Sequence, residues 1–378
     1  MEGAVMFDNY EDIPVEMVRV GCSTPEERLE FERNKIAYGK ERSELSAIAN
    51  QRAKHATCII CNKPCSSFCN SHSTPSFAIK RIAVCGKIAV PLHGDILGLG
   101  TDFGVKKAGV FHLICNDCDS TVFRDYEEPA AYKEIPTNKM LAQIAVKNYL
   151  RMVWKREYEI EMWRLRGVRY PEQKPYSDMR IRIAQFDLQG YQSQLQCAIK
   201  ALSDEGKQGY YLCYHRVLDY VVPYASQAAI AMLADFEDNV INNLLRMDCP
   251  GDIKDIHVAI FPLERTSIVL MFIENSEKRY RKFYRQLKKL SAEDQLAAIN
   301  YIIFSYIEDV YMNPTIQQEL KSHAKFVDVC RKTTDYIAAV SVSPEMRFRK
   351  TIQEFSLTKR SEIPNLLSQE YSLSQPIE

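Results

Sequence analysis

The stretch that decides the fold runs from Cys58-Ile-Ile-Cys61 to Cys115-Asn-Asp-Cys118. Each Cys-x-x-Cys pair presents two thiolates from one tight turn, and two such pairs complete a tetrahedral set of four sulfur ligands. Zinc prefers this set, and in a small module the energy of metal binding is also folding energy. We therefore expect one structural Zn²⁺ ion held by Cys58, Cys61, Cys115 and Cys118.

A second set of candidate ligands lies beside the first pair. Cys65, Cys69 and His72 follow Cys61 at short intervals, so a metal site could close locally without the second pair. We rank this alternative second, because it leaves a well-formed Cys-x-x-Cys pair unused. We interpret Cys65 and Cys69 as small buried side chains, as free cysteines often are.

The order of the elements around the cysteines predicts a treble-clef zinc module. The first pair forms a knuckle, strand-like and glycine-rich sequence follows it, and the second pair stands at the entry to a short helix. The rest of the chain mixes helical and strand-like patterns. The expected fold class is therefore α+β, with an N-terminal treble-clef zinc module followed by a larger domain of helices and strands.

The composition is that of a folded protein with an ordinary core. The chain has 378 residues, of which 46% are hydrophobic and 26% are charged. Lys+Arg and Asp+Glu both total 49, so the net charge is zero. This balance argues against a protein that coats nucleic acid non-specifically, because such binding needs many unbalanced cations. It leaves room for a local basic face.

The N-terminal residues carry no secretory signal pattern, and no apolar run reaches the length of about 18 residues needed to span a membrane. The chain has 12 cysteines, and those outside the predicted module are scattered among apolar residues. This pattern is typical of buried thiols in a reducing compartment. We therefore expect a cytoplasmic protein without a membrane partner.

Changes in pattern divide the chain into four parts. We expect a flexible arm over residues 1–23, a helix and the zinc module over 24–133, a mixed α+β domain over 134–335, and a partly flexible tail over 336–378. Helical periodicity and caps predict helices over 24–54, 137–166, 177–202, 275–290, 291–311 and 315–330. Aromatic and β-branched runs predict strands over 210–220, 256–263 and 266–273, while 228–233 fits a strand or a buried helix.

The first helix is rich in charge. A helix that is polar on all sides is either solvated or lies against a partner. We favour the solvated interpretation for residues 24–54 and keep a protein partner as the alternative.

Three motifs together resemble the HNH/treble-clef nuclease superfamily. They are Cys58-x-x-Cys61, Ser71-His72-x-x-Pro75 and Cys115-x-x-Cys118-Asp119. The form with Ser before His also resembles a group of little-characterised bacterial HNH-like proteins, for which a role in defence against phage fits by association. The resemblance covers roughly residues 55–130 and says nothing about the rest.

The resemblance implies a nuclease site. His72 matches the family's general base, and Asp119 stands where the family often has Asn or His. In the family an acidic metal ligand commonly precedes the base, whereas this chain has Ser71. Carboxylates that can substitute as ligands of a catalytic Mg²⁺ or Mn²⁺ are Asp117, Asp119, Asp125 and Glu127.

A non-catalytic interpretation stands beside it. His72 can instead form a hydrogen bond within the finger, and Asp119 can cap its helix. His112 fits a strand-face residue better than a second active-site imidazole.

A basic segment near residue 280 offers a second place for nucleic acid. Arg281, Lys282 and Arg285 recur at helical spacing beside aromatic residues, a pattern that suits a phosphate backbone. A solvated helix face explains the same pattern equally well.

Two functions from different classes follow. The first is an HNH-like, metal-dependent endonuclease that cleaves phosphodiester bonds of DNA or RNA. The alternative is a non-catalytic zinc-finger protein that binds nucleic acid or a protein partner.

Overall fold

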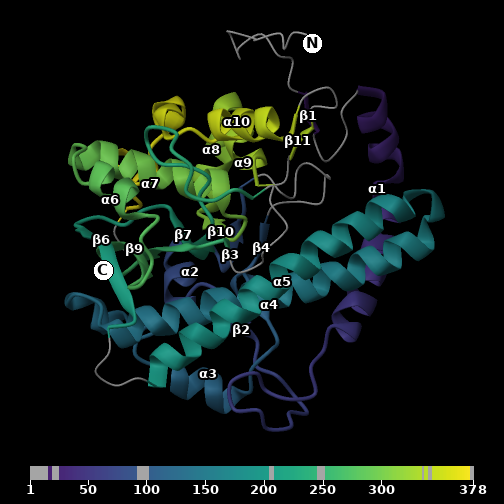
Figure 1. Ribbon diagram of the computed structural model, residues 1–378, viewed down its shortest axis with the longest axis horizontal. Helices are drawn as coiled ribbons and strands as arrows, with labels where there is room; N and C mark the ends of the chain where they lie inside the picture. Colours follow the sequence, from purple (N-terminus) through teal and green to yellow (C-terminus); the bar gives the residue numbers. More distant parts are fainter. Residues whose placement is uncertain are drawn as a thin grey trace, which may run out of the picture.

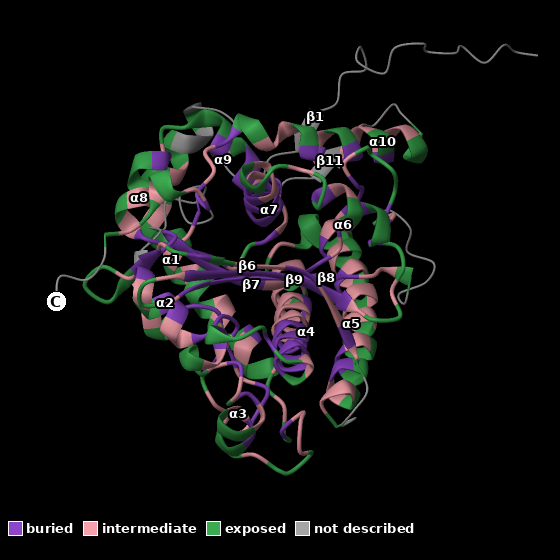
Figure 2. Cartoon of the chain, turned by 90° about the vertical axis from the view of Figure 1, so that its left-hand side faces the viewer, coloured by how far each residue is buried: buried purple, intermediate pink, exposed green. Residues whose placement is uncertain are grey.

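The computed structural model shows a mixed α+β protein in which one sheet lies between two layers of helices (Figures 1 and 2). It describes residues 16–18, 25–91, 102–203, 208–244, 252–333, 336–338 and 343–374. Most of the predicted arm over 1–23 lies outside the described residues. The predicted α+β class is confirmed.

The central sheet has seven strands in the order β4-β3-β10-β7-β8-β9-β6, and neighbouring strands are antiparallel. The four long strands are β6 (Tyr210–Leu218), β7 (Tyr224–Ile230), β8 (Ile256–Pro262) and β9 (Ser267–Glu274). The three short ones are β3 (Lys87–Ala89), β4 (Asp102–Gly104) and β10 (Val310–Met312). All three predicted strands are confirmed, and the undecided segment belongs in part to strand β7.

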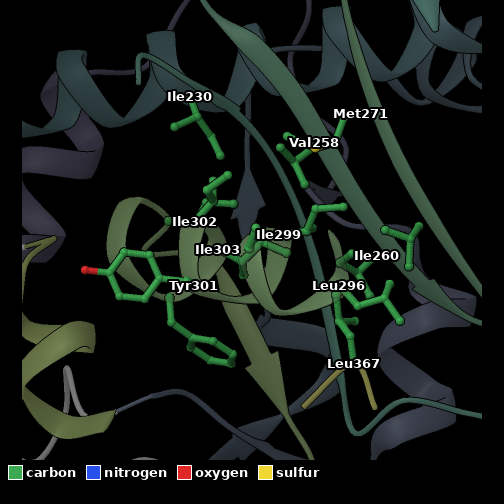
Figure 3. Packing of buried hydrophobic residues seen from close by; sticks show 14 of the residues in the cluster. Ile230, Val258, Ile260, Met271, Leu296, Ile299, Tyr301, Ile302, Ile303 and Leu367 are labelled. Atoms are coloured by element: carbon green, nitrogen blue, oxygen red, sulfur yellow. The ribbon is translucent and has the colours of Figure 1, made fainter. Parts of the chain in front are cut away.

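Strands β8 and β9 are buried on both faces, which explains why they are largely apolar without alternation. On β8, Val258 and Ile260 face one core while Ala259 and Phe261 face the other. Figure 3 shows the first of these cores, where Val258 and Ile260 meet isoleucines of helix α7 such as Ile299. The sheet is therefore the middle layer of three.

The helices of the upper layer in Figure 2 pack on the first core, except for the last of them, which buries Phe348 and Ile352 in a smaller cluster with Leu233 and Ala234. They are α6 (Arg281–Leu287), α7 (Ala292–Tyr306), α8 (Pro314–Leu320), α9 (Ala324–Arg331) and α10 (Pro344–Glu354). Three helix predictions were too long. The basic helix has seven residues, the apolar helix ends at Tyr306, and His323 caps a new helix where one helix over 315–330 was expected.

The apolar helix ends early because the chain turns extended at Ile307 and then forms strand β10. This strand lies between β7 and β3, so Val310–Met312 is buried on both faces. A short, fully buried strand and the last turn of a buried helix have the same apolar composition.

The lower layer is dominated by two long helices that run side by side, α4 (Asn138–Arg169) and α5 (Lys174–Ser203) (Figure 1). Thr137 caps α4 by accepting a hydrogen bond from the Met140 backbone N–H at 3.3 Å, as predicted. Helix α1 (Pro25–Arg52) packs on α4 and is largely exposed. No described helix is long and apolar enough to cross a membrane.

The predicted zinc module is continuous with this body. Its elements are β2 (Ser71–His72), α2 (Ser76–Ile82), β5 (Val110–Phe111) and α3 (Asn116–Val122). Strand β3 joins the central sheet through Ala89 and Met312, and the module shares one core with α4. The expected boundary after residue 133 therefore runs through a shared sheet and a shared core.

We expected a partly flexible tail over residues 336–378, of which the structure describes 336–338 and 343–374. Strand β11 (Tyr336–Ala338) pairs antiparallel with β1 (Glu16–Val18). Further on, Leu366 and Leu367 are fully buried in the upper core. The described residues 343–374 are thus part of the folded body.

Candidate metal centre and adjoining histidine site

Four cysteine sulfurs gather at one point, as the paired spacing predicts. The sulfurs of Cys58, Cys61, Cys115 and Cys118 all lie within 4.8 Å of one another, and those of Cys61 and Cys115 are 3.9 Å apart. Zinc bound to four thiolates at about 2.3 Å would set the sulfurs about 3.8 Å apart. The cluster can therefore hold a metal ion such as zinc.

Local backbone geometry brings the two pairs together. The Asn62 N–H donates to the Cys58 carbonyl at 2.8 Å, which closes the first turn. Cys115 is the residue before helix α3, so Cys118 projects from the first turn of that helix. The Ile59 N–H then donates to the Leu113 carbonyl at 3.0 Å, which ties the first turn to the strand that leads into α3.

The environment of Cys58 favours its thiolate. Burial opposes ionisation, but backbone N–H groups of Cys61, Cys115 and Ile60 point at the sulfur and lower the pKa to about 7. The Cys115 N–H is 3.4 Å from that sulfur. A thiolate is the form that binds a metal.

The rival ligand set is not assembled among the described residues. Cys65 donates to the Ser67 carbonyl at 2.8 Å, and Cys69 donates to Asp119 Oδ2 at 3.2 Å. Burial, followed by the neighbouring Asp119, raises the pKa of Cys69 to about 12. Neither thiol belongs to the four-sulfur cluster.

Asp119 lies at the centre of a buried polar network. Its Oδ1 accepts hydrogen bonds from Ser71 Oγ at 2.6 Å and from Lys147 Nζ at 2.7 Å. Lys147 also donates to Ser71 Oγ at 2.6 Å and forms an ion pair with Glu127 at 3.1 Å. Burial raises the pKa of Asp119, but Lys147, Ser71 and Cys69 outweigh it and hold the pKa below its usual value.

Lys147 is a residue of this polar network that the sequence patterns did not indicate. It comes from the middle of α4, its side chain is 1% exposed, and its ammonium lies 4.4 Å from the centre of the Phe123 ring. Its signal in the sequence is a single lysine inside the apolar run Ala145-Val-Lys-Asn-Tyr-Leu150. A lysine in such a run is almost never buried unless it is paired.

His72 is held by the segment that leads into strand β5. Strand β2 pairs with β5, and His72 Nδ1 lies 2.7 Å from the Ala108 carbonyl oxygen. Since a carbonyl only accepts, Nδ1 carries the proton, and in the neutral ring Nε2 has the free lone pair. The imidazole is therefore oriented as a base requires.

The structure does not join His72 directly to Asp119. Neighbouring residues of a strand point to opposite sides, so Ser71 faces Asp119 while His72 faces Ala108. Across the described part of the chain, no hydrogen bond or ion pair connects His72 to Asp119. The two predicted catalytic residues belong to one module but to separate contact networks.

The paired strands β2 and β5, which carry His72, are held by contacts on two sides. Gly109 has φ +56°, and a Cβ there would lie 2.2 Å from Ser73 Oγ and 2.3 Å from the Tyr311 hydroxyl. From α4, Arg151 donates to the Val110 carbonyl at 3.1 Å and is held by both oxygens of Asp309 at 2.7 and 2.9 Å.

The other candidate residues of the module have separate partners. Asp125 pairs with Lys139 at 2.8 Å and accepts a bond from Gln143 at 2.9 Å. Asp117 is exposed in the first turn of α3. His112 lies 2.8 Å from Asn70 Oδ1, and burial lowers its pKa.

The basic segment lies far from this site. Arg281, Lys282 and Arg285 are exposed on α6, which covers the upper face of the sheet, while α3 lies below it (Figure 2). Lys282 pairs with Glu237 at 2.7 Å. The basic face and the zinc module do not form one continuous surface.

No protein-family model, no curated protein and no solved structure matches this chain.

Proposed function

We propose that this chain is an HNH-like phosphodiesterase acting on DNA or RNA, with His72 as its general base. The order of the parts supports a treble-clef module: a Cys58–Cys61 turn, a two-stranded pairing of β2 with β5, and helix α3 behind the second cysteine pair. In this proposal the ion held by the four cysteines is zinc, and its role is structural.

The orientation of His72 is the observation that carries the proposal. The bond from Nδ1 to the Ala108 carbonyl fixes the ring and leaves Nε2 to accept a proton from water. A base positioned in this way typically contributes about 10²–10⁴-fold to a rate. The tight packing around Gly109 and the hydrogen bond from Arg151 to the Val110 carbonyl hold the paired strands β2 and β5 that carry His72.

A hydrolytic site also needs positive charge near the leaving oxygen. Carboxylates for a Mg²⁺ or Mn²⁺ ion are present at Asp119 and Glu127, but both contact the Lys147 ammonium. A divalent ion at these two groups would have to displace that ammonium. The dependence of cleavage on added Mg²⁺ or Mn²⁺ therefore reports whether the displacement occurs.

The test compares His72→Ala with His112→Ala. Both change one half-buried histidine of the same module, and only His72 has the proposed role. Plasmid DNA, single-stranded DNA and RNA are incubated with each variant, with and without Mg²⁺ or Mn²⁺, and metal content is measured in parallel. We expect His72→Ala to lose about 10²–10⁴-fold in rate with its metal retained, and His112→Ala to remain active. Equal cleavage by the two variants, or none by wild type, contradicts the proposal.

The buried ammonium favours a second candidate, a non-catalytic zinc-finger protein that binds nucleic acid or a protein. Lys147 neutralises Asp119 and ties it to Ser71, as a purely structural network would. Wild-type protein that binds the same nucleic acids without cleaving them, with affinity unchanged in His72→Ala, would support this candidate over the first.

A further inference from the structure

A cavity of about 620 Å³ lies at the end of β7, and none of the four clustered cysteines lines it. It is bordered by α4 and α5 on one side and by α7 and α10 on the other. Its apolar lining includes Ile183, Tyr191, Ile230, Leu233, Phe348 and Phe355. Pockets of about 300–1,000 Å³ with apolar walls and a few placed polar groups are typical of small-molecule sites.

One wall of the cavity holds a buried lysine, Lys332. Lys332 is 8% exposed, and its ammonium donates to the Tyr301 hydroxyl at 2.9 Å and to the Glu354 backbone carbonyl. Figure 3 shows the Tyr301 hydroxyl pointing away from Ile302 and Ile303. Within the described chain, no carboxylate lies at ion-pair distance from Lys332.

A buried ammonium of this kind is costly to the fold. Burial, with Lys359 nearby, lowers the pKa of Lys332 to about 8, and the more distant carboxylates of Glu354, Glu362 and Asp328 offset only part of this shift. An anion in the cavity would add to the counter-charge that these carboxylates supply.

Both carboxylates among the residues that line the cavity are already paired with cations. Glu308 is paired with Lys155 at 2.5 Å, and Asp309 is held by Arg151. Arg180 also lines the cavity and lies 5.4 Å from the Trp163 ring, and no ion pair joins it to any described residue. Lys332 and Arg180 thus line the cavity from two elements, the end of α9 and α5.

We propose that this cavity binds a nucleoside phosphate. Lys332 and Arg180 would contact the phosphate, since phosphate recognition uses several charge-assisted hydrogen bonds. The aromatic wall suits the base: the Tyr306 and Phe355 rings lie 4.9 Å apart, and Tyr191 lines the opposite side. The proposed hydrolysis at His72 uses neither Lys332 nor Arg180, so the two proposals can be tested separately.

The test is calorimetric titration of the full chain with 5′-mono- and triphosphates of the four ribonucleosides, with adenosine, and with inorganic phosphate. We expect at least one nucleotide to bind and adenosine to bind at least tenfold more weakly. Lys332→Met and Arg180→Ala should each weaken nucleotide binding by about 10–100-fold, as loss of a charged hydrogen bond does. Lys332→Met keeps the length of the side chain and removes the buried charge, so its melting temperature should not fall.

Arg182→Ala is the matched control, because Arg182 is exposed on the same helix and does not line the cavity. It should bind as wild type does. The proposal is overturned if no nucleotide binds at millimolar concentration, or if inorganic phosphate binds as tightly as every nucleotide. It is also overturned if Lys332→Met and Arg180→Ala bind as tightly as Arg182→Ala.

Discussion

The Lys147 network is the part of the structure whose energy can be worked out most directly. Lys147→Met removes the ammonium and leaves the carboxylates of Asp119 and Glu127 facing each other without a counter-charge. Breaking a buried ion pair from one side typically costs about 3–5 kcal/mol. Asp119 is 20% exposed and Glu127 is 35% exposed, so water recovers part of this energy. We expect a loss of about 2–4 kcal/mol in the free energy of unfolding.

The assay is urea unfolding followed by tryptophan fluorescence, which suits this question because Trp154 and Trp163 both lie on α4. Lys139→Met is the matched control, since Lys139 is 64% exposed and also pairs with a carboxylate, Asp125. It should change the unfolding free energy by no more than about 0.5 kcal/mol.

Asp119→Asn tests the same network from its other side. In the double variant Lys147→Met/Asp119→Asn, one stranded charge is removed together with its partner. The two changes should therefore cost at least about 1 kcal/mol less together than the sum of the single variants. A Lys147→Met variant as stable as Lys139→Met, or strictly additive costs, would refute the account of this network.

Three further predictions follow from other parts of the molecule. Gly109→Ala should destabilise the protein by more than about 1 kcal/mol in the same assay, because Gly109 has a positive φ and an added Cβ would lie 2.2 Å from Ser73 Oγ. Gly104→Ala should be nearly neutral, because an added Cβ there meets no atom within 4 Å. Burial lowers the pKa of His257 to about 3. Below pH 6.5 the unfolded chain therefore binds a proton at His257 that the folded chain does not bind. The free energy of unfolding should fall by up to about 1.4 kcal/mol per pH unit as the pH drops. His257→Gln should lack this contribution to the pH dependence of stability. If α6 contacts nucleic acid, Arg281→Ala/Arg285→Ala should flatten the salt dependence of binding by about two units, and an unchanged slope would leave the face merely solvated.

Local patterns in the sequence predicted the features that depend on local chemistry. The two Cys-x-x-Cys pairs gave the four-sulfur cluster, because each pair is one turn of chain. The Thr137 cap and the long apolar periodicity gave α4, and the aromatic and β-branched runs gave strands such as β8.

Features that depend on distant parts of the chain were beyond local patterns. The contact between Lys147 and Ser71 joins residues far apart in sequence, and it forms only because α4 packs against strand β2. Strand β10 has three residues, too few for a period to be detected, yet its pairing with β3 merges the module with the central sheet. The orientation of His72 likewise depends on the Ala108 carbonyl of the neighbouring strand region.

We predict that one metal ion joins the first cysteine turn to helix α3. Metal analysis of purified protein tests this prediction most directly. Wild type should contain one zinc per chain. Cys118→Ser should lose the zinc and unfold more easily, because metal binding is folding energy in such a module. Cys69→Ser should keep both zinc and stability, since Cys69 lies outside the cluster. Full zinc content in Cys118→Ser, or its loss in Cys69→Ser, would contradict the assignment.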